Sequence, residues 1–198
     1  MCHRFTPLTV EEAESVLTSR RDTGRATVPQ RGSEAVAPDA YPGKQVPLFV
    51  PGEDGELVVA VLTWGFDGVG QSSRLVFNTR IETALSHART GRGMWASAIE
   101  RGRCLVPVRA FFEPCTVNGQ RGEQMRFTMA GRRAFLLAGV CEGDKFSIVT
   151  TRPNESVAPV HRRMPLVLGP GESALWLGGA CEGLSDREGI VLTSEPVE

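Results

Sequence analysis

The stretch RCLVPVRAFFEP at residues 103–114 contains two apolar runs, 104–108 and 111–113, that are typical of short β-strands. The sequence on both sides continues in the same way. Further β-like runs cover 45–50, 57–63, 75–77, 124–129, 134–140, 146–150 and 166–168, and Gly-containing turns separate most of them. The chain is therefore expected to be built mainly from strands.

Helices are interspersed irregularly among these strands. Thr9 and Glu12 have the spacing of a capping box, and Val10, Ala13, Val16 and Leu17 then share one helical face, which predicts an amphipathic helix over 10–20. Residues 81–89, 93–101 and 172–177 also have helical patterns. Because the regular βαβα alternation of a parallel sheet is missing, we expect an α+β domain with a mainly antiparallel, barrel-like core flanked by a few helices.

Length and composition indicate one soluble domain. The chain has 198 residues, of which 41% are hydrophobic and 23% are charged, as in ordinary globular proteins. The longest apolar run, 134–141, is too short to span a bilayer, and the first residues carry charges where a signal peptide would be apolar, so a cytoplasmic protein without a membrane partner is expected. Five cysteines without a C-x-x-C pair predict reduced thiols, and neither a metal site nor a cofactor is expected.

The net charge of −1 hides an uneven distribution along the chain. Residues 72–133 carry 11 basic and 4 acidic side chains, whereas residues 171–198 carry 1 basic and 6 acidic side chains. A basic segment inside a nearly neutral protein indicates an anionic partner on one face, although a solvated face is the commoner meaning of such a run.

Cys2 directly follows the initiator methionine. If Met1 is removed, Cys2 offers a free α-amine beside its thiol, and such a pair condenses with an aldehyde to a five-membered thiazolidine because the ring closure is intramolecular. The alternative is that Cys2 is simply a frayed terminal residue.

Six motifs in order support the first interpretation: MCHRF at 1–5, VAP at 36–38, WG at 64–65, NTRIET at 78–83, RCLVPVRAFFEP at 103–114, and HRRMP at 161–165 with FSIVTT at 146–151 before it. Together they resemble the SRAP family of SOS response-associated peptidases and abasic-site processing proteins. The motifs run from residue 1 to about 176, so a single SRAP domain over 1–198 is expected, with an acidic end at 177–198.

The resemblance implies a function in the DNA damage response. It implies that the protein removes its own Met1, and that Cys2 then forms a covalent thiazolidine crosslink with the aldehyde of an abasic site in single-stranded DNA. Asn78, Glu113 and His161 match the asparagine, glutamate and histidine of the family's active site. These types suit the chemistry, since a carboxyl shuttles protons, an imidazole protonates a sugar oxygen, and an amide holds the N-terminus or an oxyanion. Each also has an ordinary alternative as a turn or surface residue.

The resemblance also implies a groove for DNA phosphates. Arg4, Arg80 and Arg163 match basic positions of the family motifs, and Arg162 adjoins them. Trp64 could stack on a base or fill the core. With DNA as partner, a monomer is expected, associated with the nucleoid after DNA damage.

Three positions depart from the family pattern. His3 replaces the usual glycine after the cysteine, Pro114 replaces a tryptophan after the glutamate, and Arg162 replaces an acid after the histidine. Two other functions stay open on sequence alone: a thiol peptidase acting on other proteins through Cys2, and a non-covalent single-stranded nucleic-acid binding module that would not need Cys2.

Overall fold

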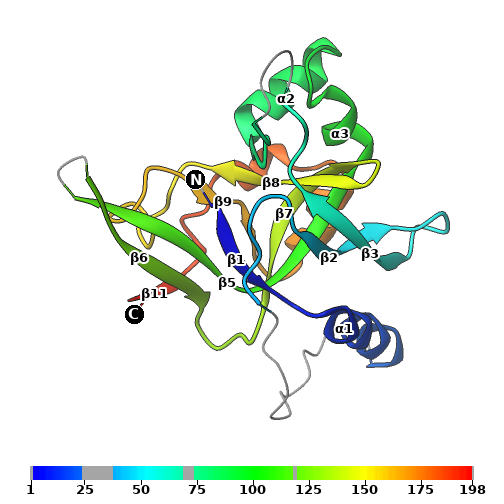
Figure 1. Cartoon of the computed structure of the whole chain (residues 1–198). Coiled ribbons are helices and arrows are strands. Elements are labelled where there is room, and N and C mark those ends of the chain that lie inside the picture. The colour runs from blue at the N-terminus through cyan, green and yellow to red at the C-terminus, as the bar shows by residue number, and fades with distance from the viewer. Residues whose placement is uncertain (1, 24–37, 69–73, 118–119, 198) are drawn as a thin grey trace.

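The structure is a computed structural model that describes residues 2–23, 38–68, 74–117 and 120–197 (Figure 1). Met1 and residues 36–37 of the VAP motif lie outside the described residues. The elements follow in the order β1 (Arg4–Pro7), α1 (Val10–Thr23), β2 (Gln45–Pro51), β3 (Leu57–Trp64), β4 (Asn78–Arg80), α2 (Ile81–Thr90), α3 (Ala96–Arg101), β5 (Arg103–Val117), β6 (Gln120–Met129), β7 (Phe135–Glu142), β8 (Lys145–Thr151), β9 (Met164–Pro165), β10 (Val167–Leu168), α4 (Glu172–Leu177), the 3-10 helix η1 (Glu182–Ser185) and β11 (Leu192–Pro196).

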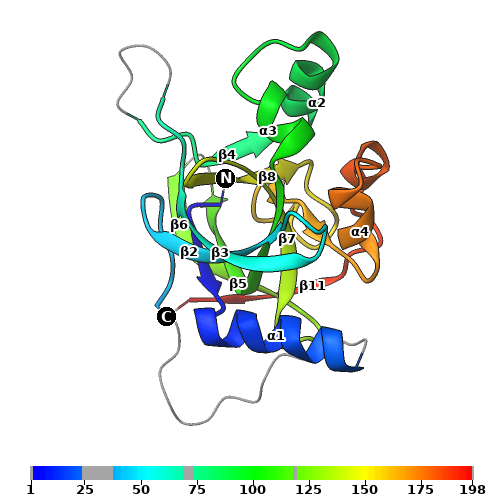
Figure 2. The ribbon, with the colours of Figure 1, turned by 90° about the vertical axis from the view of Figure 1, so that its right-hand side faces the viewer.

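The strands form one 11-stranded mixed sheet organised around β5. This strand pairs antiparallel with β1, β2, β6 and β7. The sheet runs β10-β7-β8-β3-β2-β5-β6-β11, and the additional pairing of β7 with β5 closes five of these strands into a ring, which Figure 2 views nearly end-on. Among the described strands, pairing is parallel only where β8 meets β3 and β4. The expected α+β class with a mainly antiparallel core is confirmed.

The helix α1 begins with the predicted capping box. The backbone N–H of Glu12 donates to Thr9 Oγ1 over 3.2 Å, and the backbone N–H of Thr9 donates to the Glu12 carboxylate over 3.0 Å. Ala13, Val16 and Leu17 are buried against the sheet, and Figure 2 shows α1 lying outside the ring, along its lower side. The helix continues to Thr23, three residues beyond the expected end.

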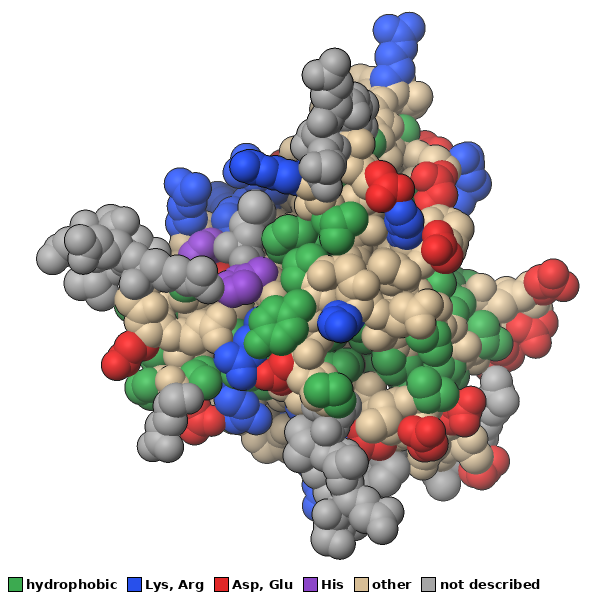
Figure 3. Space-filling view, in the orientation of Figure 1, with side chains coloured by type: hydrophobic (Ala, Val, Ile, Leu, Met, Phe, Trp, Pro, Cys, Tyr) green, Lys and Arg blue, Asp and Glu red, His purple; other side chains and the backbone are tan. Residues whose placement is uncertain are grey.

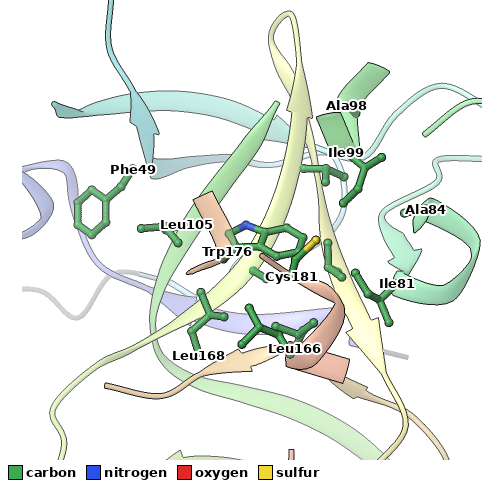
Figure 4. Close-up of a cluster of buried hydrophobic side chains, with 14 of the residues drawn as sticks. Phe49, Ile81, Ala84, Ala98, Ile99, Leu105, Leu166, Leu168, Trp176 and Cys181 are labelled. Atoms are coloured by element: carbon green, nitrogen blue, oxygen red, sulfur yellow. The ribbon is translucent and has the colours of Figure 1, made fainter. Parts of the chain in front are cut away.

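Two hydrophobic clusters fill the molecule. In the first, Trp176 of α4 packs beside Cys181 and Leu168, and its indole N–H donates to the Cys104 carbonyl over 3.0 Å (Figure 4). The second cluster includes Cys2, Phe5 and Trp64. The N-terminal segment is therefore part of the core, and it brings Cys2 with it.

The structure differs from the sequence expectations in three places. The runs 104–108 and 111–113 belong to one strand, β5, and the run 75–77 contributes only a bridge at Val76 before β4 begins. The strands β1, β4, β9 and β11 were not predicted. They are short or polar, and they exist because β5, β8 and β6 supply their partners.

Candidate functional site

Cys2 lies just before β1, and its side chain is fully buried. The thiol donates a hydrogen bond to the backbone carbonyl of Arg4 over 3.5 Å. Burial raises the pKa of the Cys2 thiol well above its ordinary value, and the negative charge of Glu113 raises this pKa further. The thiol is therefore protonated at neutral pH, and it needs a proton acceptor before it can act as a nucleophile.

Glu113 lies in the long strand β5, where it pairs with Met125 of β6. Its side chain is fully buried, and burial raises the pKa of the carboxyl to about 7. A carboxyl with this pKa is about half ionised at neutral pH, so it is able to act both as proton donor and as proton acceptor.

His161 precedes β9 in a segment that Asn154 stabilises. The Asn154 side chain accepts a hydrogen bond from the backbone of Val157, and the His161 backbone N–H donates to the Val157 carbonyl over 2.9 Å. The His161 Nδ1 lies 3.8 Å from Glu113 Oε2 and donates to the Arg163 carbonyl over 2.8 Å. Burial lowers the pKa of His161, which favours a neutral ring at neutral pH.

Asn78 is the first residue of β4, which runs parallel to β8. Its amide nitrogen donates to the backbone carbonyl of Cys2 over 2.7 Å. The amide oxygen is buried and has no hydrogen-bond partner within the part of the chain that the structure describes. Of the two roles that the sequence left open, the geometry fits holding the N-terminal residue. The amide contacts the backbone carbonyl of Cys2.

The four predicted residues thus meet at one place although they are widely separated in sequence. Asn78 contacts Cys2, the Glu113 charge acts on the Cys2 thiol, and Glu113 lies beside His161. Figures 1 and 2 both show the start of β1 next to β8, the strand that β4 and β9 also join.

The predicted DNA-binding arginines fall into two groups. Arg80 and Arg162 are exposed. Arg163 is held within the protein: its guanidinium pairs with both oxygens of Glu82 at 2.9 and 3.0 Å, donates to the Thr150 carbonyl, and leaves only 14% of the side chain exposed. The hydrogen bonds from Arg163 also lower the pKa of the Glu82 carboxyl. Arg163 therefore stabilises the fold near the site.

Trp64 is fully buried, and the hypothesis that it stacks on a base is contradicted by this burial. Its ring packs against Phe5, with centroids 4.7 Å apart, and lies parallel to Phe146. The indole N–H donates to the Phe77 carbonyl over 2.8 Å. Trp64 therefore fills the core, which is the alternative that the sequence left open.

The sequence did not identify a polar network that surrounds Arg4. Its guanidinium contacts Asp39 Oδ2 through Nε at 2.7 Å and Nη2 at 2.6 Å, and donates to Gln124 Oε1 at 2.6 Å. The guanidinium also lies 4.1 Å from the ring centre of Phe112. Gln124 in turn reaches His3, with 3.2 Å between the two Nε2 atoms. Neither Asp39 nor Gln124 stands in a motif that points to this site. The bridge between Ala40 and Phe5 of β1 places Asp39, and the pairing of β6 with β5 places Gln124.

Two other features bear on the class of site. Within the described residues, no three His, Cys, Asp or Glu side chains cluster as ligands for a metal ion. No helix in those same parts of the chain is both long and apolar enough to cross a membrane.

Comparison with known proteins agrees with the motif pattern. The abasic site processing protein YoaM of Bacillus subtilis is 27% identical over 113 residues, which cover 52% of this chain and 47% of YoaM. The abasic site processing protein YoqW of the same organism is 30% identical over 84 residues, 38% of each protein. The chain thus matches about half the length of YoaM and less of YoqW.

Solved structures share the fold. A phage-related protein from Bordetella bronchiseptica superposes with a TM-score of 0.68 at 23% identity, covering 99% of this chain and 94% of that protein. A protein from Bacteroides thetaiotaomicron has a TM-score of 0.68 at 17% identity, covering 100% of this chain and 92% of that one. The family profile described as SOS response associated peptidase (SRAP) matches residues 1–195. Because this match spans nearly the whole sequence, the chain belongs to the SRAP family.

Proposed function

We propose that this protein removes its own Met1 and then captures abasic sites in single-stranded DNA through Cys2, as a covalent thiazolidine. The observation that carries the proposal is the convergence of a buried Cys2 with a carboxyl of pKa about 7 and an imidazole, Glu113 and His161. The names of YoaM and YoqW, which describe abasic site processing, support the same substrate.

The first step prepares the nucleophile. Water adds across the Met1–Cys2 peptide bond, and the products are free methionine and a chain whose Cys2 carries an α-amine. Glu113 accepts and returns the proton that moves in this hydrolysis, a role that suits a carboxyl with a pKa near neutrality. Asn78 holds the carbonyl on the other side of Cys2, so the residue keeps its place when Met1 leaves.

The second step captures the lesion. The ring-opened sugar presents an aldehyde, the Cys2 amine adds to it, and loss of water gives an imine. The thiol then adds to the imine carbon, a C–S bond forms, the thiol proton goes to Glu113, and the nitrogen takes up a proton. His161 supplies the acid that opens the sugar ring, because its lowered pKa makes the protonated fraction of the ring a stronger acid.

The raised pKa of the Cys2 thiol supports an order in which the amine reacts first. A protonated, buried thiol reacts slowly with electrophiles from solution. Its addition to an imine on the same residue is faster, because this ring closure is intramolecular. The site would therefore favour aldehydes that the amine has already bound over general alkylating agents.

The DNA strand would approach over the exposed arginines. Arg80 and Arg162 lie on elements that border the site, and Figure 3 shows arginine and lysine side chains gathered beside histidine side chains on one face. A single strand bound over this face would place the lesion next to Cys2. A protein with this substrate would work in the cytoplasm, at the nucleoid.

The test compares Cys2→Ala with wild-type protein on a denaturing gel. One oligonucleotide carries an abasic site, and a second carries a tetrahydrofuran residue, which has no aldehyde. Cys2→Ala should bind both reversibly and form no heat-stable adduct, because an amine alone gives only a hydrolysable imine. Cys115→Ala, a change of another free cysteine two residues from Glu113, is the matched control and should keep the adduct.

Intact mass and a second variant complete the test. The mature protein should lack Met1, and Glu113→Gln should slow both Met1 removal and capture by about 10²–10⁴-fold. A stable adduct formed by Cys2→Ala, or equal crosslinking of the tetrahydrofuran strand, would refute the assignment. Binding without any adduct in wild-type protein would instead favour a non-covalent module, and cleavage of unrelated peptides would favour a peptidase.

A further inference from the structure

His3 ends a chain of side-chain contacts that starts at Asp39. The Asp39 carboxylate accepts a hydrogen bond from Thr6 Oγ1 over 2.5 Å and holds the Arg4 guanidinium through two of its nitrogens. Arg4 Nη1 then donates to the Gln124 side-chain oxygen over 2.6 Å. The network therefore joins β1, β6 and the residues before β2 around the residue that follows Cys2.

The donor and the acceptor of each hydrogen bond in this network are fixed in turn, from Arg4 through Gln124 to His3. A guanidinium can only donate, so the atom of Gln124 that faces Arg4 is the amide oxygen. The amide nitrogen consequently faces His3 Nε2, 3.2 Å away, and it also can only donate. His3 Nε2 must therefore accept, which leaves the ring proton on Nδ1.

We propose that Gln124 is a positioning residue of the Cys2 site, which holds His3 as the uncharged imidazole whose proton is on Nδ1. A proton added at Nε2 would oppose the Gln124 N–H with a second donor and break the contact. Gln124 thereby sets the pH at which a further cation appears beside Cys2.

The surroundings of His3 explain why its charge matters. The charged and titratable groups on its own segment are Arg4 and Cys2, which carries the α-amine once Met1 is removed. Those on the neighbouring elements are Asp39 before β2, Glu113 on β5, Arg126 on β6, and His161 and Arg162 before β9. The charge of His3 acts on His161, as one of the smaller causes that lower the pKa of His161 after burial itself. An imidazolium at residue 3 would join Arg162 and make the face more cationic.

The consequence for DNA rests on the proposed function. When His3 takes up a proton, the binding face gains a charge that can contact a phosphate. Affinity for a single strand should then increase on acidification, and the slope of log K against log salt should steepen by about 0.7 for one added contact.

The first experiment follows the histidine rings of the free protein by NMR, with His3→Asn used to assign the His3 signals. In wild-type protein a long-range ¹⁵N–¹H spectrum should show the proton of neutral His3 on Nδ1. The midpoint pH of His3 should be lowest in wild-type protein, higher by about half a unit to one unit in Gln124→Leu, and highest in Gln124→Glu. A carboxylate at residue 124 would accept a hydrogen bond from the protonated His3 ring. The contact would then stabilise the charged ring and no longer the neutral ring.

A matched control and a binding measurement complete the design. Gln45→Glu is the matched control for Gln124→Glu, because it introduces a carboxylate at an exposed position of β2. It should leave the midpoint pH of His3 unchanged. Binding to a tetrahydrofuran-containing single strand at about pH 5.5 and about pH 8 should show the steeper acid slope in wild-type protein and a smaller change in His3→Asn, where His161 and Glu113 still titrate nearby.

An Nε2-protonated ring in wild-type protein, or a His3 midpoint that does not follow the order of the three residue-124 variants, would overturn the proposal. Because the tautomer and the midpoints are measured without DNA, they test the role of Gln124 even if no crosslink forms. The absence of an adduct with the correct tautomer would instead refute the proposed function.

Discussion

Replacing Glu113 by glutamine should make the protein more stable at neutral pH while it loses activity. The wild-type carboxyl is fully buried, and its pKa is about 7 in place of the ordinary 4.5, because burial disfavours the charged form. Between these two values the folded state holds a proton that the unfolded state has released. The wild-type stability therefore falls as pH rises through this window, and glutamine, which has nearly the same shape and no charge, removes the loss.

The magnitude follows from the size of the shift. A difference of about 2.5 pKa units corresponds to about 3 kcal/mol at 1.36 kcal/mol per unit, reached once the pH exceeds both values. At about pH 5 only about 1 kcal/mol of this loss is present, so the stability gap between Glu113→Gln and wild-type protein should widen by about 2 kcal/mol from about pH 5 to about pH 8.

Urea unfolding followed by tryptophan fluorescence at several pH values measures this gap. Glu53→Gln changes an exposed carboxylate in the turn between β2 and β3, and its gap to wild-type protein should stay constant over the same range. A pH-independent gap for Glu113→Gln would show that the Glu113 carboxyl ionises normally, and the assignment of both proton roles to Glu113 would fail with it.

Five other substitutions test the remaining assignments. Arg80→Ala and Arg162→Ala should each reduce the slope of log K against log salt for single-stranded DNA by about 0.7. Arg163→Ala should lower the unfolding free energy and leave this slope unchanged. An altered slope for Arg163→Ala would show that Arg163 contacts DNA. Trp64→Ala should cost about 3–5 kcal/mol in urea unfolding without changing the salt slope, since the side chain lies in the core. Thr9→Ala should cost about 0.5–2 kcal/mol through loss of the α1 cap, and an unchanged midpoint would remove the cap from the stabilising contacts.

The sequence predicted the elements that are determined by their own local residues. The Thr9–Glu12 capping box forms as expected, and α4 has the expected bounds of 172–177. The strand β1 could not be predicted in this way, because Arg4–Pro7 is only four residues long and ends in proline. It becomes a strand only when β5 pairs with it, which is a property of the assembled sheet.

In the candidate site too, some features could be predicted from the sequence and others depend on the assembled fold. Motif resemblance identified Cys2, Asn78, Glu113 and His161, and the structure brings these four side chains together. Residue type alone could not reveal that Arg163 is neutralised, because its partner Glu82 is 81 residues away. For the same reason Gln124 could not be identified from the sequence, because its contacts depend on the register of β6 against β5.

The pairing of Arg4 with Phe112 joins residues that are 108 positions apart, and this distance has a consequence for protein synthesis. At a rate of roughly 5–20 residues per second, β1 leaves the ribosome several seconds or more before β5 exists to receive it. During that interval Glu113 has not been made, so under the proposed mechanism it cannot yet assist cleavage of the bond before Cys2. Self-processing would therefore report that folding is complete, and a nascent chain would carry no reactive aminothiol through the crowded, aldehyde-containing cell.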